Sequence, residues 1–229
     1  MRIAVIPARG GSKRIPRKNI RKFAGKPIIA WPIEVALSSG LFDKVVVSTD
    51  DQEIARIAEG LGTLVPFSRK PDLADDHADT KAVVIDAIQE LGLSEDSSAD
   101  ICCIYPTAVF LTVDLLIEGL TKLDSSAASF TFAMTNLDPV VFRSFTKSDD
   151  GRVKMLFPEN YSVRSQDLPN IFCDAAQFYW GKVGSWQSDR PVIGADSIGI
   201  FINSSRVQDI DTEEQLISAE TKFRKLEQS

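Results

Sequence analysis

Short runs of β-branched and apolar residues alternate with helix-like patterns through the first half of the chain, and this alternation restricts the possible folds most strongly. We predict strands at residues 3–6, 45–48, 64–67, 101–104 and 129–134. We predict helices at residues 28–39, 50–61, 82–91 and 115–123. Such alternation is typical of a mostly parallel sheet with helices packed on its faces. The pattern therefore predicts the α/β class, and the length of 229 residues fits a single domain, 1–229.

The pattern changes after Asn136. Residues 140–145 and 152–156 are expected to pair as a hairpin, because the intervening Asp149-Asp150-Gly151 favours a tight turn. Residues 158–194 are polar, aromatic and irregular. We therefore predict a small β-rich insertion at about 137–194, which serves sugar binding or dimerisation. A strand at 198–202 and a helix at 212–226 are expected to end the chain, with Thr212 and Gln215 at capping-box spacing.

Several features indicate a cytoplasmic protein. No apolar run approaches the length of a membrane-spanning helix, and the N-terminal residues lack the features of a signal peptide. The cysteines Cys102, Cys103 and Cys173 have no paired spacing, which favours free thiols in a reducing compartment. Cys102 and Cys103 are adjacent on a predicted strand, so we expect them to point to opposite faces of the sheet.

The charge distribution indicates a local anionic ligand. The net charge is −6, yet the residues before Glu34 include nine basic side chains and no acidic one. A concentrated positive segment on an acidic protein suits a small anion better than nucleic acid, which needs a broad basic face. We therefore expect neither nucleic acid nor a membrane as a partner, and RNA binding is the least favoured alternative.

The loop at residues 7–19 is the strongest candidate for phosphate binding. It follows the first predicted strand, where open α/β sheets bind their ligands. Gly10 and Gly11 allow the backbone to approach a phosphate chain closely. Cationic partners are available at three positions of the loop: Arg9, Lys13 and Lys18. The loop matches neither a Walker A motif nor the G-x-G-x-x-G fingerprint, and the alternative interpretation is a solvated basic turn.

A second candidate site is Asp209-Ile210-Asp211. In an extended segment both carboxylates lie on one face, which suits Mg²⁺. Asp211 also stands just before the last predicted helix and is a candidate cap, and the two roles are compatible. Asp50 and Asp51 follow the second strand, where helix capping is the favoured role. His77, the single histidine, is expected in an exposed turn rather than in a metal site.

These motifs, in this order, resemble those of the CMP-sugar synthetases, the acylneuraminate cytidylyltransferase family. The resemblance spans the chain and includes four further segments: Val47-Ser48-Thr49-Asp50, Arg69-Lys70-Pro71, Tyr105-Pro106-Thr107 and Asp209-Ile210-Asp211-Thr212. Residues 157–160, 164–168 and 174–181 are most similar to the members that act on pseudaminic acid. The resemblance implies a Rossmann-like three-layer α/β/α nucleotidyltransferase fold, a divalent metal ion and a homodimer.

The loop chemistry and the resemblance together assign roles to individual residues. Nucleotide binding is assigned to Ala8, Arg9, Gly10, Gly11, Ser12, Lys13, Lys18, Asn19, Arg69, Tyr105, Pro106 and Thr107. Sugar binding is assigned to Arg164, Gln166, Asp174, Gln177 and Tyr179. Asp209 and Asp211 are the predicted Mg²⁺ ligands, and the predicted catalytic residues are Lys13, Arg9 and Asp211.

The resemblance implies a reaction between CTP and a nine-carbon sugar acid, most similar to pseudaminic acid. The anomeric C2 hydroxyl of the sugar attacks the α-phosphorus of CTP, and pyrophosphate leaves. One alternative is a CMP-N-acetylneuraminate synthetase or a synthetase for another sugar acid, such as an eight-carbon one. An alternative of a different class is a nucleotide-binding module without catalysis.

Overall fold

A computed structural model describes residues 1–75 and 78–228 of the chain. Its centre is a six-stranded sheet with the strand order β10-β6-β9-β5-β1-β4. The strands are β1 (Arg2–Pro7), β4 (Lys44–Ser48), β5 (Asp100–Ile104), β6 (Phe130–Leu137), β9 (Ile171–Lys182) and β10 (Ser197–Phe201). The β1–β4, β1–β5 and β6–β10 pairs are parallel, and β9 runs antiparallel to both of its neighbours. The predicted mostly parallel sheet is confirmed.

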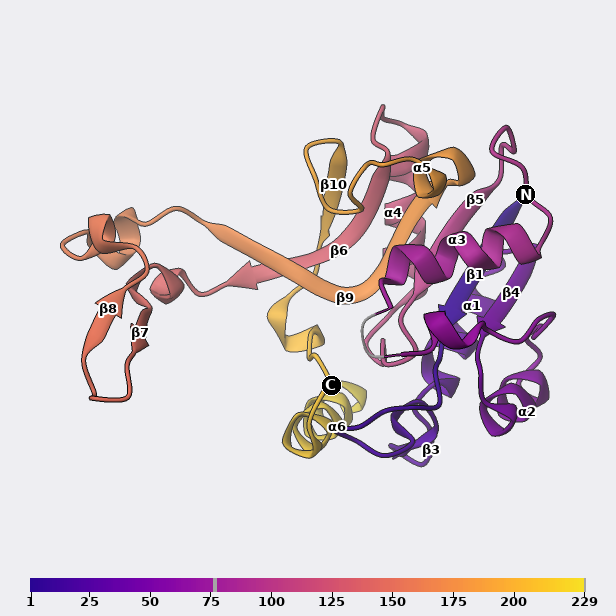
Figure 1. Cartoon of the computed structure of the whole chain (residues 1–229), viewed down its shortest axis with the longest axis horizontal. Coiled ribbons are helices and arrows are strands. Elements are labelled where there is room, and N and C mark those ends of the chain that lie inside the picture. Colours follow the sequence, from indigo (N-terminus) through magenta and orange to yellow (C-terminus); the bar gives the residue numbers. More distant parts are fainter. Residues whose placement is uncertain (76–77, 229) are drawn as a thin grey trace.

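Helices cover both faces of this sheet (Figure 1). They are α1 (Ala30–Ser38), α2 (Gln52–Gly60), α3 (Thr80–Glu90), α4 (Val113–Asp124) and α5 (Val183–Gln187), whereas α6 (Glu213–Glu227) belongs to a separate cluster. α1, α2 and α4 pack on one face, with Ile33 and Leu116 in the buried cluster there. α3 and α5 pack on the other face, with Trp186 in its cluster. Cys102 and Cys103 lie one in each cluster as free thiols, so the expected three layers and opposite-facing cysteines are confirmed.

Local capping signals set the helix ends. The Asp51 carboxylate accepts hydrogen bonds from the Glu53 and Ile54 amides and caps α2, as predicted. Thr212 caps α6 in a complete capping box with Gln215. The prediction that Asp211 caps the last helix is wrong, because Thr212 occupies the cap position of α6 and Asp211 precedes it.

Three of the predicted elements differ in the structure. Residues 158–194 are not irregular throughout, because β9 is a central strand and α5 follows it. Residues 64–67 do not form a strand but only isolated bridges at Leu64 and Ser68. Most of 140–145 lies in a 3-10 helix, Pro139–Arg143, so the hairpin is confined to β7 (Phe145–Lys147) and β8 (Val153–Met155).

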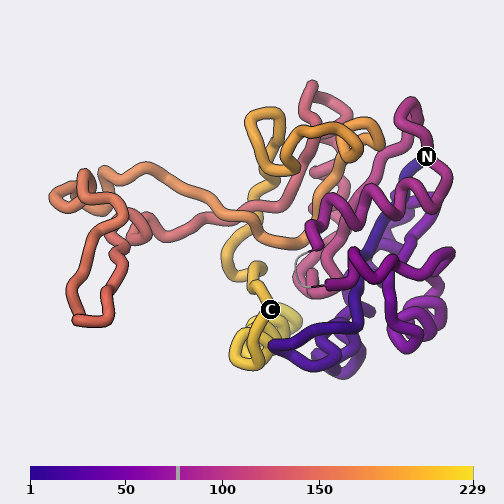
Figure 2. The backbone as a smooth tube through the Cα atoms, viewed as in Figure 1, coloured from indigo at the N-terminus to yellow at the C-terminus, as the bar shows by residue number. Residues whose placement is uncertain are grey.

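Residues 138–170, which we call the arm, project away from the sheet (Figures 1 and 2). The arm is connected by a two-stranded ribbon in which β6 and β9 continue to pair as far as Leu137 and Ile171. Phe142 and Phe157 pack edge to face within it. Other large apolar side chains of the arm are exposed: Val140, Phe145, Val153, Leu156 and Tyr161. The arm therefore presents an apolar surface outside the main body.

The last helix packs against the N-terminal segment rather than against the sheet. Phe223 of α6 contacts Phe23, which lies in the small hairpin of β2 (Lys22–Phe23) and β3 (Lys26–Pro27), and it also contacts Trp31 and Phe110. Ile15 of the N-terminal loop belongs to the same buried cluster. This packing brings the residues just before α6 beside the loop. Within the described residues, none of the helices is long and apolar enough to cross a membrane.

Candidate functional site

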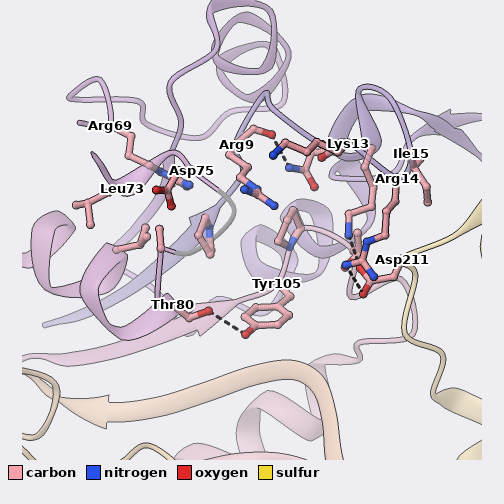
Figure 3. Close-up of a pocket in the computed structure, with 18 residues that line it drawn as sticks. Arg9, Lys13, Arg14, Ile15, Arg69, Leu73, Asp75, Thr80, Tyr105 and Asp211 are labelled. Carbon is pink, nitrogen blue, oxygen red and sulfur yellow. Dashed lines mark hydrogen bonds and ion pairs between the residues drawn. The ribbon is translucent and has the colours of Figure 1, made fainter. Parts of the chain in front are cut away.

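A cavity of about 450 Å³ lies at the carboxyl ends of β1 and β5 (Figure 3). Its walls come from the N-terminal loop, from residues 69–75 and 78–83, from the loop after β5, and from the segment before α6. The predicted residues on these walls are Arg9, Ser12, Lys13, Lys18, Asn19, Arg69, Tyr105, Pro106, Thr107 and Asp211. The topology therefore assembles segments from opposite ends of the chain around one concave, cationic surface.

Gly10 has a different role from the one expected. Its amide donates a hydrogen bond to the Asp50 Oδ1 atom at 2.9 Å, so that amide is directed at the protein rather than at the cavity. A Cβ at Gly10 would lie 2.7 Å from the Asp51 Oδ2 atom, which explains the need for glycine there. Gly10, Gly11 and Ala8 are absent from the cavity wall. The prediction that Asp50 caps a helix is also wrong, since its carboxylate binds the loop.

Asp211 binds two of the loop cations. Its carboxylate accepts a hydrogen bond from Lys18 Nζ at 3.0 Å and pairs with the Arg14 guanidinium at 2.7 Å. Lys18 Nζ also donates to the Ile210 carbonyl at 2.9 Å. Burial tends to raise the pKa of Asp211, but Lys18 and Arg14 lower it overall. Asp211 is therefore ionised and holds the two cations on the cavity wall.

Arg69 places a buried positive charge on the opposite wall. Its side chain is only 5% exposed, and its guanidinium donates to the hydroxyl of Ser48 at 3.1 Å and to the Ser48 carbonyl. Burial lowers the pKa of Arg69 to about 10, while the charge of Asp50 partly opposes that shift. The guanidinium therefore remains protonated at neutral pH. A charge in this low-dielectric position attracts an anion more strongly than a solvated one would.

Tyr105 and Thr80 form a polar edge of the cavity, with their hydroxyls 3.0 Å apart (Figure 3). Burial raises the pKa of Tyr105, so its hydroxyl stays neutral at physiological pH.

Sequence reasoning missed several wall residues: Pro7, Arg14, Ile15, Leu73, Asp75, Ala78, Thr80 and Val83. Arg14 was detectable, because it lies within the basic loop, whereas Asp75 and Thr80 carry no chemical signature in the sequence.

The predicted sugar-binding residues do not line the cavity. Tyr179 is buried and donates a hydrogen bond to the Asp174 carboxylate at 2.5 Å. The buried Gln177 amide donates to the Arg206 carbonyl at 2.9 Å. The remaining two, Arg164 and Gln166, lie on the arm, where Arg164 Nε binds Asp167 at 2.7 Å. Contact of all five with a sugar stays a prediction.

The two predicted metal ligands also differ in position. Asp211 lines the cavity, whereas Asp209 is exposed and is absent from its wall. The described residues hold no group of three or more His, Cys, Asp and Glu side chains suited to a metal ion. Mg²⁺ in nucleotide sites is commonly held by one or two carboxylates together with phosphate oxygens. Of the two predicted ligands, Asp211 is therefore the one whose position fits such a site, and His77 lies outside the described residues.

Known proteins of similar sequence show the family to which this chain belongs. A family of cytidylyltransferases matches residues 3–153. A pseudaminic acid cytidylyltransferase of Campylobacter jejuni is 39% identical over 97% of this chain and 96% of its own length. A CMP-N,N'-diacetyllegionaminic acid synthase of Legionella pneumophila is 36% identical over 77% of this chain and 73% of its own.

The fold also matches a solved structure of low sequence similarity. A CMP:2-keto-3-deoxy-manno-octonic acid synthetase, solved in complex with CTP, superposes with a TM-score of 0.72 at 15% identity. The match covers 98% of this chain and 99% of that one, and it shows a shared α/β nucleotidyltransferase fold. On the family match and the near full-length similarity, this chain belongs to the cytidylyltransferase family.

Proposed function

We propose that this enzyme transfers the cytidylyl group of CTP to pseudaminic acid and releases pyrophosphate. The observation that carries the proposal is the 39% identity to the Campylobacter jejuni enzyme over nearly the full length of both chains. The cavity supports it, because a triphosphate requires several positive groups at close range. In the reaction, a bond forms between the sugar hydroxyl oxygen and the α-phosphorus, the bond from that phosphorus to the pyrophosphate oxygen breaks, and the hydroxyl proton is lost to water.

The residues of the cavity act by binding and by neutralising charge. Phosphoryl-type transfer is accelerated mainly by positioning and by cations near the oxygens that gain charge, so a covalent nucleophile is not required. Arg9 and Lys13 lie on the wall with Lys18, and we assign to them the phosphates of CTP. Arg69 faces them from the other wall and supplies a charge that water does not screen.

We propose that Asp211 holds a Mg²⁺ ion together with the phosphates. A bound Mg²⁺ would neutralise phosphate charge there and lower the pKa of the attacking hydroxyl. Asp209 was predicted as a second ligand, but it is exposed and outside the cavity wall. Mg²⁺ titrations of pyrophosphate release with Asp211→Asn and Asp209→Asn separate the two. If the Mg²⁺ concentration required for activity rises only in Asp211→Asn, Asp211 is the single protein ligand of the two. If it rises equally in both variants, both Asp209 and Asp211 bind the ion.

We also propose that the arm forms a homodimer. Its exposed apolar side chains, including Phe145 and Val153, support burial against a second copy. Arg164 and Gln166 belong to the arm, which projects away from the sheet (Figure 1), and neither lines the cavity of its own chain. If these two residues bind sugar, the cavity they serve is that of the partner. Light scattering of Val153→Glu tests the proposal: a monomer supports it, and an unchanged dimer removes this face from the contact.

We propose a cytoplasmic location for the reaction. The free thiols Cys102, Cys103 and Cys173 support it, because a reducing compartment keeps such thiols from forming disulfides. Fractionation of cells that make the protein is the direct measurement.

The reaction is tested by pyrophosphate release from CTP and Mg²⁺ with pseudaminic acid, with N-acetylneuraminic acid, or with no sugar. Release that depends on pseudaminic acid supports the proposal. Release with N-acetylneuraminic acid alone would retain the reaction and replace the substrate. Tight CTP binding without release under either acid would favour another sugar acid or a nucleotide-binding module without catalysis.

A further inference from the structure

Arg17 has an unusual backbone conformation within the phosphate-binding loop. Its φ of 58° and ψ of 34° lie in the left-handed region, which residues other than glycine seldom adopt. Its side chain extends toward the start of α2, whereas the next residue, Lys18, extends to the cavity wall and binds Asp211. The two adjacent cations therefore connect the loop to two different segments of the chain.

The connection from Arg17 to the start of α2 is a network of charge-assisted hydrogen bonds. The Arg17 guanidinium donates to both oxygens of Asp51, including a 3.1 Å bond from Nη2 to Oδ1, and to the Glu53 carboxylate at 2.5 Å. Asp51 is itself fixed, because its Oδ1 atom accepts from the Glu53 and Ile54 amides at 2.8 and 3.0 Å. The hydrogen bond from Arg17 also holds the pKa of Asp51 below its ordinary value.

The same corner of the protein contacts the beginning of the loop. Asp50 accepts a hydrogen bond from the Gly10 amide at 2.9 Å, and the side chain of Asp51 packs closely against Gly10. The β4–α2 corner thus contacts the loop at Gly10 and again at Arg17. Lys13, on the cavity wall, lies between these two contacts along the chain.

We propose that Arg17 and Asp51 are positioning residues, whose ion pair sets the loop conformation that places Lys13 and Lys18 against the phosphates of CTP. Neither Arg17 nor Asp51 lines the cavity, so neither is assigned a contact with the nucleotide. The inference deepens the proposed function, because it depends on CTP as the ligand of this loop. It also divides the basic loop residues into those that bind the ligand and one that shapes the loop.

The structure separates this role from a purely stabilising one. The Arg17 side chain is 42% exposed and that of Asp51 is 17% exposed, and an ion pair with a solvent-exposed partner contributes little to the stability of a folded protein. Removal of the pair should therefore leave the melting temperature nearly unchanged. Displacement of the loop cations by about 1 Å, in contrast, weakens interactions that depend on alignment.

The test uses two single variants, their combination and a matched control. Arg17→Ala removes the guanidinium, and Asp51→Ser removes the carboxylate but keeps a good helix cap. Arg21→Ala is the control, because Arg21 belongs to the same basic segment, is 47% exposed and pairs with Glu213 instead. CTP dissociation constants are measured by calorimetry without any sugar acid, and melting temperatures are recorded for each variant.

We expect each single variant to weaken CTP binding about tenfold, and the double variant to be no weaker than either, because both remove the same interaction. Arg21→Ala should bind CTP within about twofold of wild type. In turnover, the KM for CTP should rise while the KM for the sugar acid stays unchanged. Wild-type CTP affinity in Arg17→Ala, additive losses in the double variant, or losses that follow the melting temperature would each overturn the proposal. Because CTP binding is measured alone, a failure of pseudaminic acid as substrate leaves this result intact.

Discussion

Replacement of Arg69 by methionine should weaken CTP binding without stabilising the protein. Burial lowers the pKa of this guanidinium from its ordinary value to about 10. Each pKa unit corresponds to about 1.4 kcal/mol, so keeping the charge buried costs about 3 kcal/mol at neutral pH. Arg69→Met removes that cost, but it also removes two hydrogen bonds from a charged donor to the buried Ser48, which contribute about 1.5–3 kcal/mol each. The free energy of unfolding should therefore be unchanged or fall by up to about 3 kcal/mol.

The loss of CTP affinity in the same variant tests the charge separately from stability. A hydrogen bond to a charged group contributes about 1.5–3 kcal/mol, so CTP affinity should fall by at least about tenfold. Calorimetry gives the affinity, and the melting temperature should stay the same or fall, by up to about 12 °C for a chain of this length. Arg152→Met, which removes an exposed cation of the arm, is the control and should change neither quantity. A higher melting temperature in Arg69→Met, or unchanged CTP affinity, would refute this reasoning.

Three further predictions follow from other groups. Lys13→Ala should lower kcat/KM by at least about a hundredfold with little change in melting temperature, and near-normal kinetics would exclude Lys13 from the reaction. Burial raises the pKa of Asp100, so the folded protein binds the proton of this carboxyl group more tightly than the unfolded chain does. The free energy of unfolding therefore falls as the pH rises from about 4 through the pKa of Asp100 in the folded protein. Asp100→Asn should be more stable than wild type above that range and equal to it below, as checked by urea unfolding at several pH values. Lys70→Met leaves the buried Asp86 carboxylate without its ion-pair partner, so the free energy of unfolding measured with urea should fall; an unchanged denaturation midpoint would contradict this.

The parallel part of the fold was predictable because its strands are continuous apolar runs. Residues 101–104 are apolar throughout, since both faces of β5 are buried beneath helices. β9 escaped prediction because polar residues such as Asp174 and Gln177 interrupt its apolar pattern. Asp174 accepts hydrogen bonds from the Ala176 amide and from Tyr179 within the same strand, whereas the Gln177 amide donates to the carbonyl of Arg206, a distant residue that the local sequence does not reveal.

The site was predictable where its chemistry is local. The basic loop carries its own signature, so Lys13 and Lys18 were identified from charge and position. The role of Gly10 was misjudged because the atom that excludes a side chain there belongs to Asp51, which is distant in the sequence. Thr80 was missed for a similar reason, because it joins the site only through the packing of α3 against the sheet.

The placement of Asp211 explains how so many cations can share one wall before a ligand arrives. Arg14 and Lys18 would repel each other at close range, and each would lose stabilising interactions if the cavity held them without a counter-charge. The carboxylate of Asp211 offsets this repulsion, and the packing of Phe223 against the N-terminal segment holds that carboxylate in position. If the phosphates of CTP bind on this wall as proposed, they compete with Asp211 for the same cations. Affinity for CTP would then reflect the exchange of one anionic partner for another, rather than the charge of the loop alone.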